Sequence, residues 1–491
     1  MSQSIYKNQC HQLRVLFDQA KSPRQILCVP IDYAKSKHVG LICDGHGNVL
    51  KQAFTIHNNQ EGIAFLLEQV NATARRRKIP KSQIFFGGED LPSYAENFAY
   101  NLRKHGYLVT RVNAKLAKEN RESEIASNDN LDLLGIAKTL LSRRARVVAD
   151  PSEVDDPDIY KSICNLSRSR NRWVKNSTAI ANQIHTHVDQ LFPGFLDPGQ
   201  CGLTPFTEVS MELMKSSRFS ADQFARRKPS SLAKTLRKKR VRNAEEKAQQ
   251  IIDLAQSVLK PDPRYIGSQQ QTLQAAVELY QCSQRVSEQL KIECAILLAS
   301  TPYAFITSIP GIGLTIGSGC SGELGNPNKL LGIDNLCSYS GIAPAIYQSG
   351  GPDKPAQTGK TPKRCNRTLK YWVNMASMKM ARWGDAQWKS RYATWECNGQ
   401  NALLKGSKRY LRLTKTLTRR QTTYQSPAAR RAGATKEVRA SDAEHTWAQL
   451  VGKWSVVPGY QEVVFAEDKP LGFWRKLMIE MFDAEMPLPP Q

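Results

Sequence analysis

The sequence predicts an α/β domain near the start of the chain, followed by mainly helical segments. Three consecutive runs have the continuous or alternating apolar pattern of strands: ILCVPID, HVGLICD and VLKQAFTIH. Beyond them, segments with helical spacing alternate with further short apolar runs. Three antiparallel strands followed by alternating helices and strands form the order of an RNase H-like domain, which we expect at residues 25–150.

Each element of this domain has its own signal in the sequence. Asp44-Gly45 and Gly47-Asn48 indicate a turn between the second and third strands. The pattern then predicts a helix in EGIAFLLEQVNATARRR, a strand in QIFFGGE, a helix in YAENFAYNLRKHG, a strand in YLVTRVN and a helix in LDLLGIAKTLLSRRA. Gly106 is suited to the C-cap of the second helix. Residues 1–24 are expected to form an appendage with a short helix.

Four acidic residues of this domain are candidate metal ligands. Asp32 lies in the first strand and Glu89 ends the fourth, while Asp129 and Asp132 stand three apart at the start of the last helix and share one face. Carboxylates that converge from two strands and a helix repel each other unless a cation neutralises them. Mg²⁺ prefers hard oxygen ligands, and two-metal sites stabilise both oxygens of a phosphoryl displacement. The sequence therefore predicts a Mg²⁺ site that cuts or joins nucleic acid.

Some alternatives remain open within this set. Asp90 is a substitute ligand for Glu89, because the two are adjacent. One of Asp129 and Asp132 can support the ligands through hydrogen bonds instead of binding the metal directly. Glu124 is interpreted as a solvated charge.

The charge balance points to a polyanionic partner. The 491 residues, enough for two or three domains, contain 69 Lys and Arg against 44 Asp and Glu, a formal net charge of +25. No apolar run approaches the ~18 residues of a membrane span, and no signal or lipidation motif is evident. This argues for nucleic acid over a membrane surface and for a cytoplasmic protein. The 11 Cys show no metal-binding spacing and are expected to be reduced, and the 8 His are expected to be structural or exposed.

The middle of the chain predicts an arm. Residues 150–158, DPSEVDDPD, resemble a linker, and a long helix follows that stops at Pro193-Gly194. A densely basic run occupies residues 226–250, and a second long helical stretch covers 266–299. Two long helices separated by a loop predict an antiparallel coiled-coil arm within residues 151–299.

A mainly helical domain is expected at residues 300–425. The PGIG sequence at 310–313 lies between two helical patterns, as in a helix-hairpin-helix turn, and it is either a structural turn or a phosphate contact. A basic helix follows in KTPKRCNRTLKYWVNMASMKMARW, where Trp372 and Trp383 are interpreted as core residues in preference to base-stacking ones. Residues 426–491 form an extension with no assigned role.

Ten cations are predicted to contact nucleic acid, chiefly phosphates. They are Arg226, Arg227, Lys238, Lys239, Arg240, Lys363, Arg364, Arg367, Arg419 and Arg420.

Several ordered motifs resemble one transposase family. They are GGEDLPSYAENFAYNLRKHGYLVTRVNAKLAKENRES, SNDNLDLLGIA, LFPGF, ITSIPGIGLTIGSGCSGELG and YSGIAPAIYQSGG, spread over residues 26–425. The chain is similar to the insertion-sequence one-ten family of bridge-RNA-guided recombinases. The resemblance implies a RuvC-like domain whose Asp-Glu-Asp-Asp set is Asp32, Glu89, Asp129 and Asp132, and a separate transposase domain. It departs from the family at Cys365, where Gly is usual, and at Leu91-Pro92.

The resemblance also implies a second catalytic element. The family has a serine in a Ser-Gly pair after a Gly-x-x-Pro segment, which corresponds here to Ser349. Ser349 would attack a DNA phosphate and form a phosphoserine link. Ser338 and Ser340 are the nearby alternatives. The partners implied are a structured guide RNA, target and donor DNA, and further copies of the chain in a tetramer, in a prokaryotic cytoplasm at the nucleoid.

Two other functions remain open. A metal-dependent nuclease or junction resolvase would use water in place of Ser349. A transposase-derived protein without catalytic activity would only bind nucleic acid.

Overall fold

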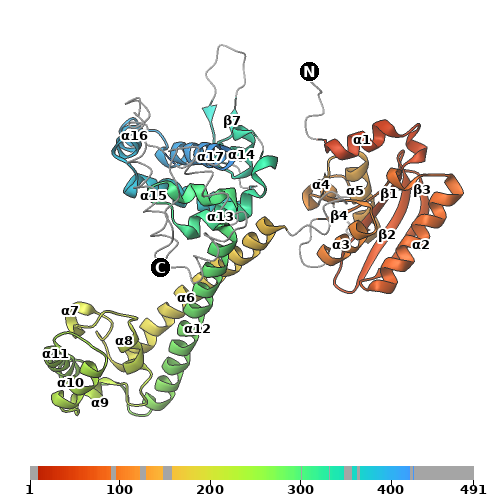
Figure 1. The fold of residues 1–491 in the computed structure, drawn as a ribbon. Coiled ribbons are helices and arrows are strands. Elements are labelled where there is room, and N and C mark those ends of the chain that lie inside the picture. The colour runs from red at the N-terminus through yellow and green to blue at the C-terminus, as the bar shows by residue number, and fades with distance from the viewer. Residues whose placement is uncertain are drawn as a thin grey trace, which may run out of the picture. The chain divides into compact units, whose positions relative to one another are not determined.

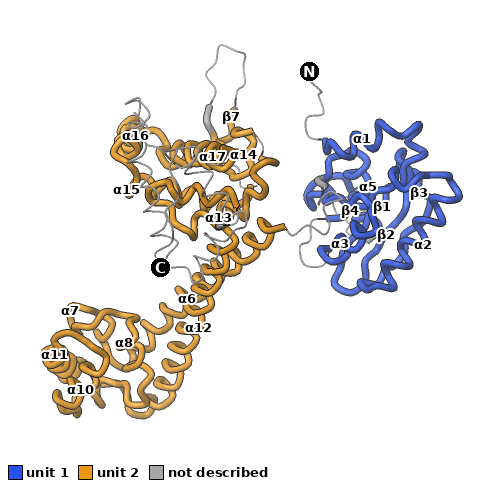
Figure 2. Tube along the Cα trace, in the orientation of Figure 1, with its two compact units in different colours: residues 1–157 blue, residues 158–491 orange. Residues whose placement is uncertain are grey.

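The computed structural model divides into two compact units, residues 1–157 and 158–491, which are described separately (Figure 2). The residues it describes are 9–89, 95–121, 129–147, 158–299, 301–330, 332–347, 357–361, 365–420 and 424. Asp90, Glu124, Ser349, Lys363 and Arg364 lie outside them, as do the Leu91-Pro92 pair and the extension at 426–491.

The first unit is built on a six-stranded mixed sheet with the order β3-β2-β1-β4-β5-β6 (Figure 1). Its strands are β1 (Leu27–Asp32), β2 (Lys37–Asp44), β3 (Val49–His57), β4 (Ile84–Glu89), β5 (Leu108–Val112) and β6 (Arg146–Val147). The first three pair antiparallel, whereas β1, β4 and β5 run parallel to each other. This order is consistent with the predicted RNase H-like domain. The two-residue β6, antiparallel to β5, was not predicted.

Helices cover both faces of this sheet. They are α1 (His11–Gln19), α2 (Gln60–Arg77), α3 (Glu96–Lys104), α4 (Ala114–Glu119) and α5 (Asp129–Leu141). Alternate residues of β1 and β4 enter opposite cores, because successive side chains of a strand point to opposite faces. Val29 and Phe86 pack with α2 and α3, whereas Cys28 and Phe85 pack with α1 and α5. A strand buried on both faces reads as a continuous apolar run, which is why ILCVPID lacks alternation.

Local chemistry sets the ends of these helices. Asn59 caps α2 by accepting a hydrogen bond from the backbone N–H of Gly62. The predicted helix ending at Gly106 closes two residues earlier, at Lys104, and Gly106 follows with φ +75°. The last helix was predicted to run to residue 145 but ends at Leu141, because Arg143 turns the chain with φ 60°.

The second unit begins with two long helices and a helical lobe between them. Helices α6 (Ile159–Leu191) and α12 (Ile266–Ala299) lie side by side (Figure 1), at the predicted positions. The regular side-chain packing of a coiled coil stays a prediction. The lobe contains α7 (Pro198–Cys201), α8 (Glu208–Met214), α9 (Ala221–Ala225), α10 (Pro229–Lys238) and α11 (Ala244–Ser257). Its core surrounds Phe192, Phe195, Phe219 and Phe224, so the basic run is part of a folded body.

The rest of the second unit is mainly helical. Its elements are η4 (Pro302–Ser308), α13 (Leu314–Leu324), η5 (Pro327–Lys329), α14 (Ile333–Tyr339), β7 (Ile346–Tyr347), β8 (Gln357–Thr358), α15 (Arg367–Trp383), α16 (Ala386–Cys397) and α17 (Ala402–Arg420). The core includes Tyr303, Trp372 and Tyr410. The predicted PGIG turn precedes α13, but the helix before it is a 3₁₀-helix. The β7–β8 pair was not predicted.

No single helix among the described residues is long and apolar enough to span a membrane. Helices α12 and η4 together have the length and apolar composition of a bent span.

Candidate active site

Asp32 and Glu89 lie at the same edge of the first unit's sheet. They end β1 and β4, neighbouring parallel strands in which Ile31 is in register with Gly88. Each acid comes one residue after this pair, so both side chains point to the same face. By the same alternation this is the face that Cys28 and α5 occupy. Both acids are half-buried.

Helix α5 brings Asp132 to this face. Its carboxylate lies 2.5 Å from a guanidinium nitrogen of Arg121, and the two side chains are only 21% and 14% exposed. Burial raises the pKa of Glu89, the negative charge of Asp132 raises it further, and Arg121 lowers it. Glu89 and Asp132 are therefore close enough to repel each other. Asp129 begins α5, but its side chain lies outside the described residues.

Close packing at two glycines holds these elements together. A Cβ at Gly87 would lie 2.4 Å from the Leu140 side chain of α5, and one at Gly88 would lie 2.3 Å from both the Ile31 carbonyl and the Tyr33 ring. These distances are shorter than any van der Waals contact, so only glycine allows α5 and Tyr33 to approach β4 this closely. The Gly-Gly pair thus positions Glu89 against α5.

The carboxylates fit a hard divalent cation by their chemistry. The donors are oxygens and their charges are alike, and burial together with the charge of Asp132 raises the pKa of Glu89. Among the described residues, however, no group of three His, Cys, Asp or Glu side chains is close enough to hold a metal. Arg121, which the sequence reasoning missed, contacts Asp132 as the neighbouring cation. Its only signal in the sequence was a positive charge shortly before the Asp129–Asp132 helix.

The serine candidates lie in the second unit. Ser349 lies outside the described residues, between β7 and β8 in the sequence. Ser340 is fully buried, and its hydroxyl donates to the Cys337 carbonyl at 3.2 Å. Ser338 is exposed on α14. Burial therefore argues against Ser340 as a nucleophile, whereas Ser338 is accessible.

Comparison with known families matches both units. A family described as a transposase with a DEDD domain matches residues 29–193, and one described as the IS116/IS110/IS902 transposase family matches residues 303–393. This chain belongs to the IS110 family of transposases. The two matches cover more than half of it. The search of curated proteins found no match.

The IS110 assignment establishes the general activity. The chain is a DNA transposase of a mobile insertion sequence, and its substrates are DNA. The DEDD match spans all four acids predicted as ligands and implies dependence on a divalent metal. The second match spans Ser349 and the PGIG turn.

The predicted cations of the lobe divide into two groups. Arg226 pairs with Asp222, and Lys239 pairs with Glu208 and Glu212, so their charges are partly neutralised. Arg227 is half-buried, and its guanidinium lies 5.9 Å from the centre of the Phe224 ring.

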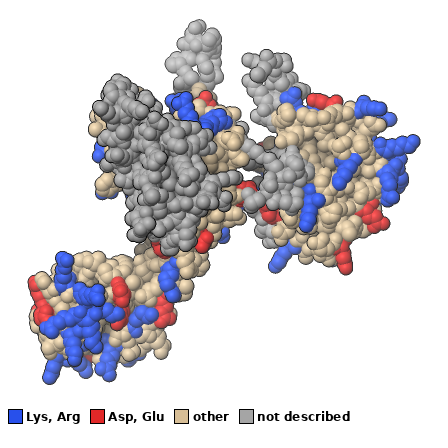
Figure 3. All heavy atoms as spheres, in the orientation of Figure 1, with Lys and Arg blue, Asp and Glu red and all other residues tan. Residues whose placement is uncertain are grey.

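Two other lobe cations are available for phosphate. Lys238 and Arg240 are exposed, and neither forms an ion pair with an acid that the structure describes. Figure 3 shows Lys and Arg side chains gathered on this lobe.

The predicted cations of the C-terminal helices also differ. Arg419 donates to the backbone carbonyls of Pro327 and Leu330, which is a structural role. Arg367 and Arg420 are exposed. Trp372 is 4% exposed and lies in the core, as predicted. The same prediction is wrong for Trp383, which is 57% exposed, because this residue ends α15 beyond the core.

Proposed function

We propose that this transposase exchanges DNA strands through a phosphoserine intermediate formed by Ser349, with Mg²⁺ held by Asp32, Glu89, Asp129 and Asp132. The observation that carries the metal part is the register of β1 and β4. It directs Asp32 and Glu89 to the face of α5, where Asp132 lies. Burial raises the pKa of Glu89 most, and the charge of Asp132 raises it further; a bound divalent cation would offset this repulsion.

Each step of the reaction breaks one phosphorus–oxygen ester bond and forms another. The Ser349 oxygen loses its proton and forms a bond to the phosphorus, while the bond from phosphorus to the 3′-oxygen breaks. The 3′-oxygen leaves and takes up a proton. A 3′-hydroxyl of the other duplex then loses its proton and forms a bond to the phosphorus, while the bond from phosphorus to the Ser349 oxygen breaks and the serine hydroxyl regains a proton. Mg²⁺ at the carboxylates would supply positive charge for the developing negative oxygens.

The carboxylates and the serine belong to different units of the chain. Asp32, Glu89 and Asp132 are in the first unit, and Ser349 is in the second. A site that contains both the carboxylates and the serine therefore requires a first unit and a second unit to come together. We infer that the units come from different subunits of a tetramer, as the family resemblance implies.

In this proposal a structured guide RNA selects the DNA sequences on which the transposase acts. The net charge of +25 and the exposed Lys238 and Arg240 suit a protein that binds phosphates of both RNA and DNA. Base pairing would select the target and donor, while the protein reads backbone and shape.

Three serine variants test the nucleophile. Ser349→Ala should abolish both strand cleavage and strand exchange with substrate DNA and guide RNA present, because no phosphoserine can form. Ser338→Ala removes the accessible alternative hydroxyl and should retain both activities, since Ser349 is the proposed nucleophile. Ser349→Cys should keep binding of DNA unchanged. Cleavage that persists in Ser349→Ala would contradict the proposal: it would mean that Ser338 attacks if it is lost in Ser338→Ala, and that water attacks, as in a resolvase, if it is not.

A further inference from the structure

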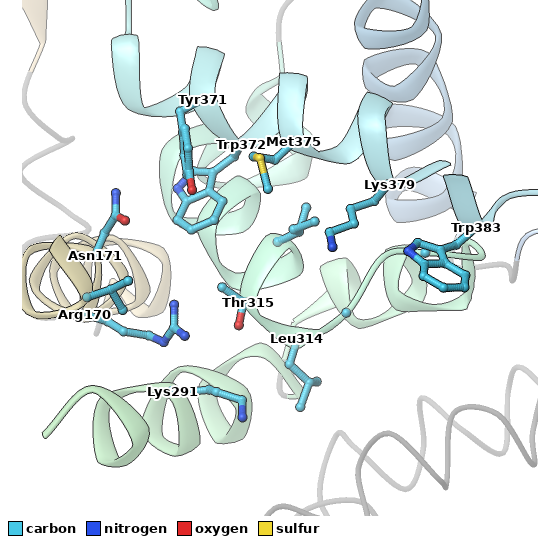
Figure 4. A pocket seen from close by; sticks show the side chains of 14 residues that line it. Arg170, Asn171, Lys291, Leu314, Thr315, Tyr371, Trp372, Met375, Lys379 and Trp383 are labelled. Carbon is cyan, nitrogen blue, oxygen red and sulfur yellow. The ribbon is translucent and has the colours of Figure 1, made fainter. Parts of the chain in front are cut away.

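A cavity of about 580 Å³ lies in the second unit, and the described residues that line it include none of those assigned to catalysis. Four segments line it: α6, α12, the PGIG turn with the start of α13, and α15 (Figure 4). Cavities of about 300–1,000 Å³ hold single small molecules or the equivalent part of a larger one. Its size therefore suits one nucleotide better than a folded partner.

The charge of the lining is positive. Arg170, Lys291 and Lys379 contribute to it, and none of the described residues that line it is acidic. Lys291 pairs with the exposed Glu288 at 2.6 Å, but Arg170 and Lys379 form no ion pair within the described part of the chain. An anionic ligand is therefore the electrostatic complement of this cavity.

Aromatic rings lie beside these cations. Trp383 is 57% exposed and Tyr371 is 45% exposed, although both are large apolar side chains. The ring of Tyr371 packs at 4.8 Å against Trp372, which is buried and fixes its position. Proteins that bind single strands stack unpaired bases on exposed aromatic rings and bind the phosphates with neighbouring cations. The combination favours a nucleotide over a simple anion such as sulfate.

Backbone donors complete the lining. Helix α13 begins at Leu314, and its N-cap Gly313 has no side chain to satisfy the first backbone N–H groups. The Gly313 position opens into free space, since a Cβ there would meet nothing within 4 Å. A helix start of this kind attracts phosphate.

Arg170 adds an unsatisfied donor to the lining. Its Nε is buried and has no hydrogen-bond partner among the described residues, and its side chain is directed into the cavity (Figure 4). Buried donors normally have partners, because an unmade hydrogen bond costs about 1–3 kcal/mol. An anionic ligand beside this guanidinium would offset that cost.

We propose that this cavity binds one unpaired nucleotide of a single-stranded segment. The base stacks on Trp383, and its phosphate lies near Lys379 and the start of α13. The inference rests on the proposed function only in that the transposase handles nucleic acid, and it adds a recognition site that uses none of the catalytic residues. Strand exchange and a structured RNA both present unpaired nucleotides, so the chemistry is shared and the strand type is left to experiment.

Photocrosslinking tests the site on the unmodified full-length chain. Single-stranded oligonucleotides of one sequence, as DNA and as RNA, carry one 5-iodouracil and are irradiated with the protein. We expect crosslinks in the peptide that contains Trp383. The strand type that crosslinks more strongly identifies the natural ligand, and crosslinks confined to other peptides would overturn the proposal.

Binding of variants gives an independent readout. Trp383→Ala should weaken binding of the preferred single strand by about 5- to 150-fold, the effect of losing one base–aromatic stack, and Trp383→Phe should restore most of it. Trp395→Ala, a partly buried tryptophan outside the cavity, is the matched control and should bind as the wild type does. Equal affinities of Trp383→Ala and the wild type would refute the site. Loss of covalent catalysis in Ser349→Ala would leave these affinities unchanged, so the two proposals fail separately.

Discussion

Glu323 of α13 is the centre of a polar network that joins three helices. Its side chain is only 3% exposed. It accepts hydrogen bonds from Arg168 Nε at 2.7 Å and Nη2 at 2.8 Å, and from Asn366 Nδ2 at 2.7 Å. Arg168 belongs to α6, and Asn366 caps α15 by accepting from the Leu369 N–H. The network therefore fixes how α6, α13 and the start of α15 pack.

The two members of the ion pair differ in burial, and this sets the size of each effect. Replacing Arg168 by Met leaves the buried Glu323 carboxylate without its cation, which costs about 3–5 kcal/mol. Replacing Glu323 by Gln leaves Arg168 unpaired, but the Arg168 side chain is 48% exposed and water can solvate it. The loss is then that of hydrogen bonds to a charged group, about 1–3 kcal/mol. We expect Arg168→Met to be the more destabilising change.

Urea unfolding of the full chain, followed by tryptophan fluorescence, measures this difference. All eight Trp lie at residue 173 or later, so the signal reports the second unit alone. The control is Lys408→Met at the exposed pair with Asp334, where we expect less than about 1 kcal/mol. Two results would contradict this expectation. One is an equal loss in the free energy of unfolding for Glu323→Gln and Arg168→Met. The other is a loss in both variants that is no larger than that of Lys408→Met.

Three further outcomes follow from particular residues. Arg121→Ala should lower the melting temperature without metal and enlarge the rise on adding Mg²⁺, since the cation beside the carboxylates is lost; equal rises would contradict this. Gly311→Ala should cost about 1–3 kcal/mol in urea unfolding, because φ is +87° and a Cβ would lie 2.7 Å from a backbone carbonyl, whereas Gly313→Ala should cost less. Burial raises the pKa of Cys320 to about 12, so at pH 8 its thiol should resist a maleimide that labels exposed Cys397, and rapid labelling of both would show an open core.

The strand-end acids were predictable because their signal is local. Apolar runs that end in an acid place Asp32 and Glu89 at the edge of the sheet, and the alternation of side chains gives them a common face. Arg121 was missed because its contact with Asp132 depends on how the chain returns between α4 and α5. The six-residue α4 and the two-residue β6 were missed because such short elements have no periodic pattern.

In the second unit, too, the elements with a local periodic pattern were predicted and those without one were not. The long helices α6 and α12 were predicted from sustained helical spacing, whereas the folded lobe between them was read as a basic insert. Its core depends on phenylalanines spread over the loops and on α9, which no local period reveals. The exposure of Trp383 and the cavity beside it arise from four segments far apart in the sequence.

The most direct measurement of the proposed chemistry is the site of covalent attachment between protein and DNA. A substrate nicked next to the cleavage position traps the intermediate, because the released fragment diffuses away and rejoining fails. We expect peptide mass spectrometry to find DNA linked to Ser349, with the adduct lost in EDTA and in Asp32→Ala. DNA cleaved without any adduct, or an adduct on another residue, would contradict the serine mechanism.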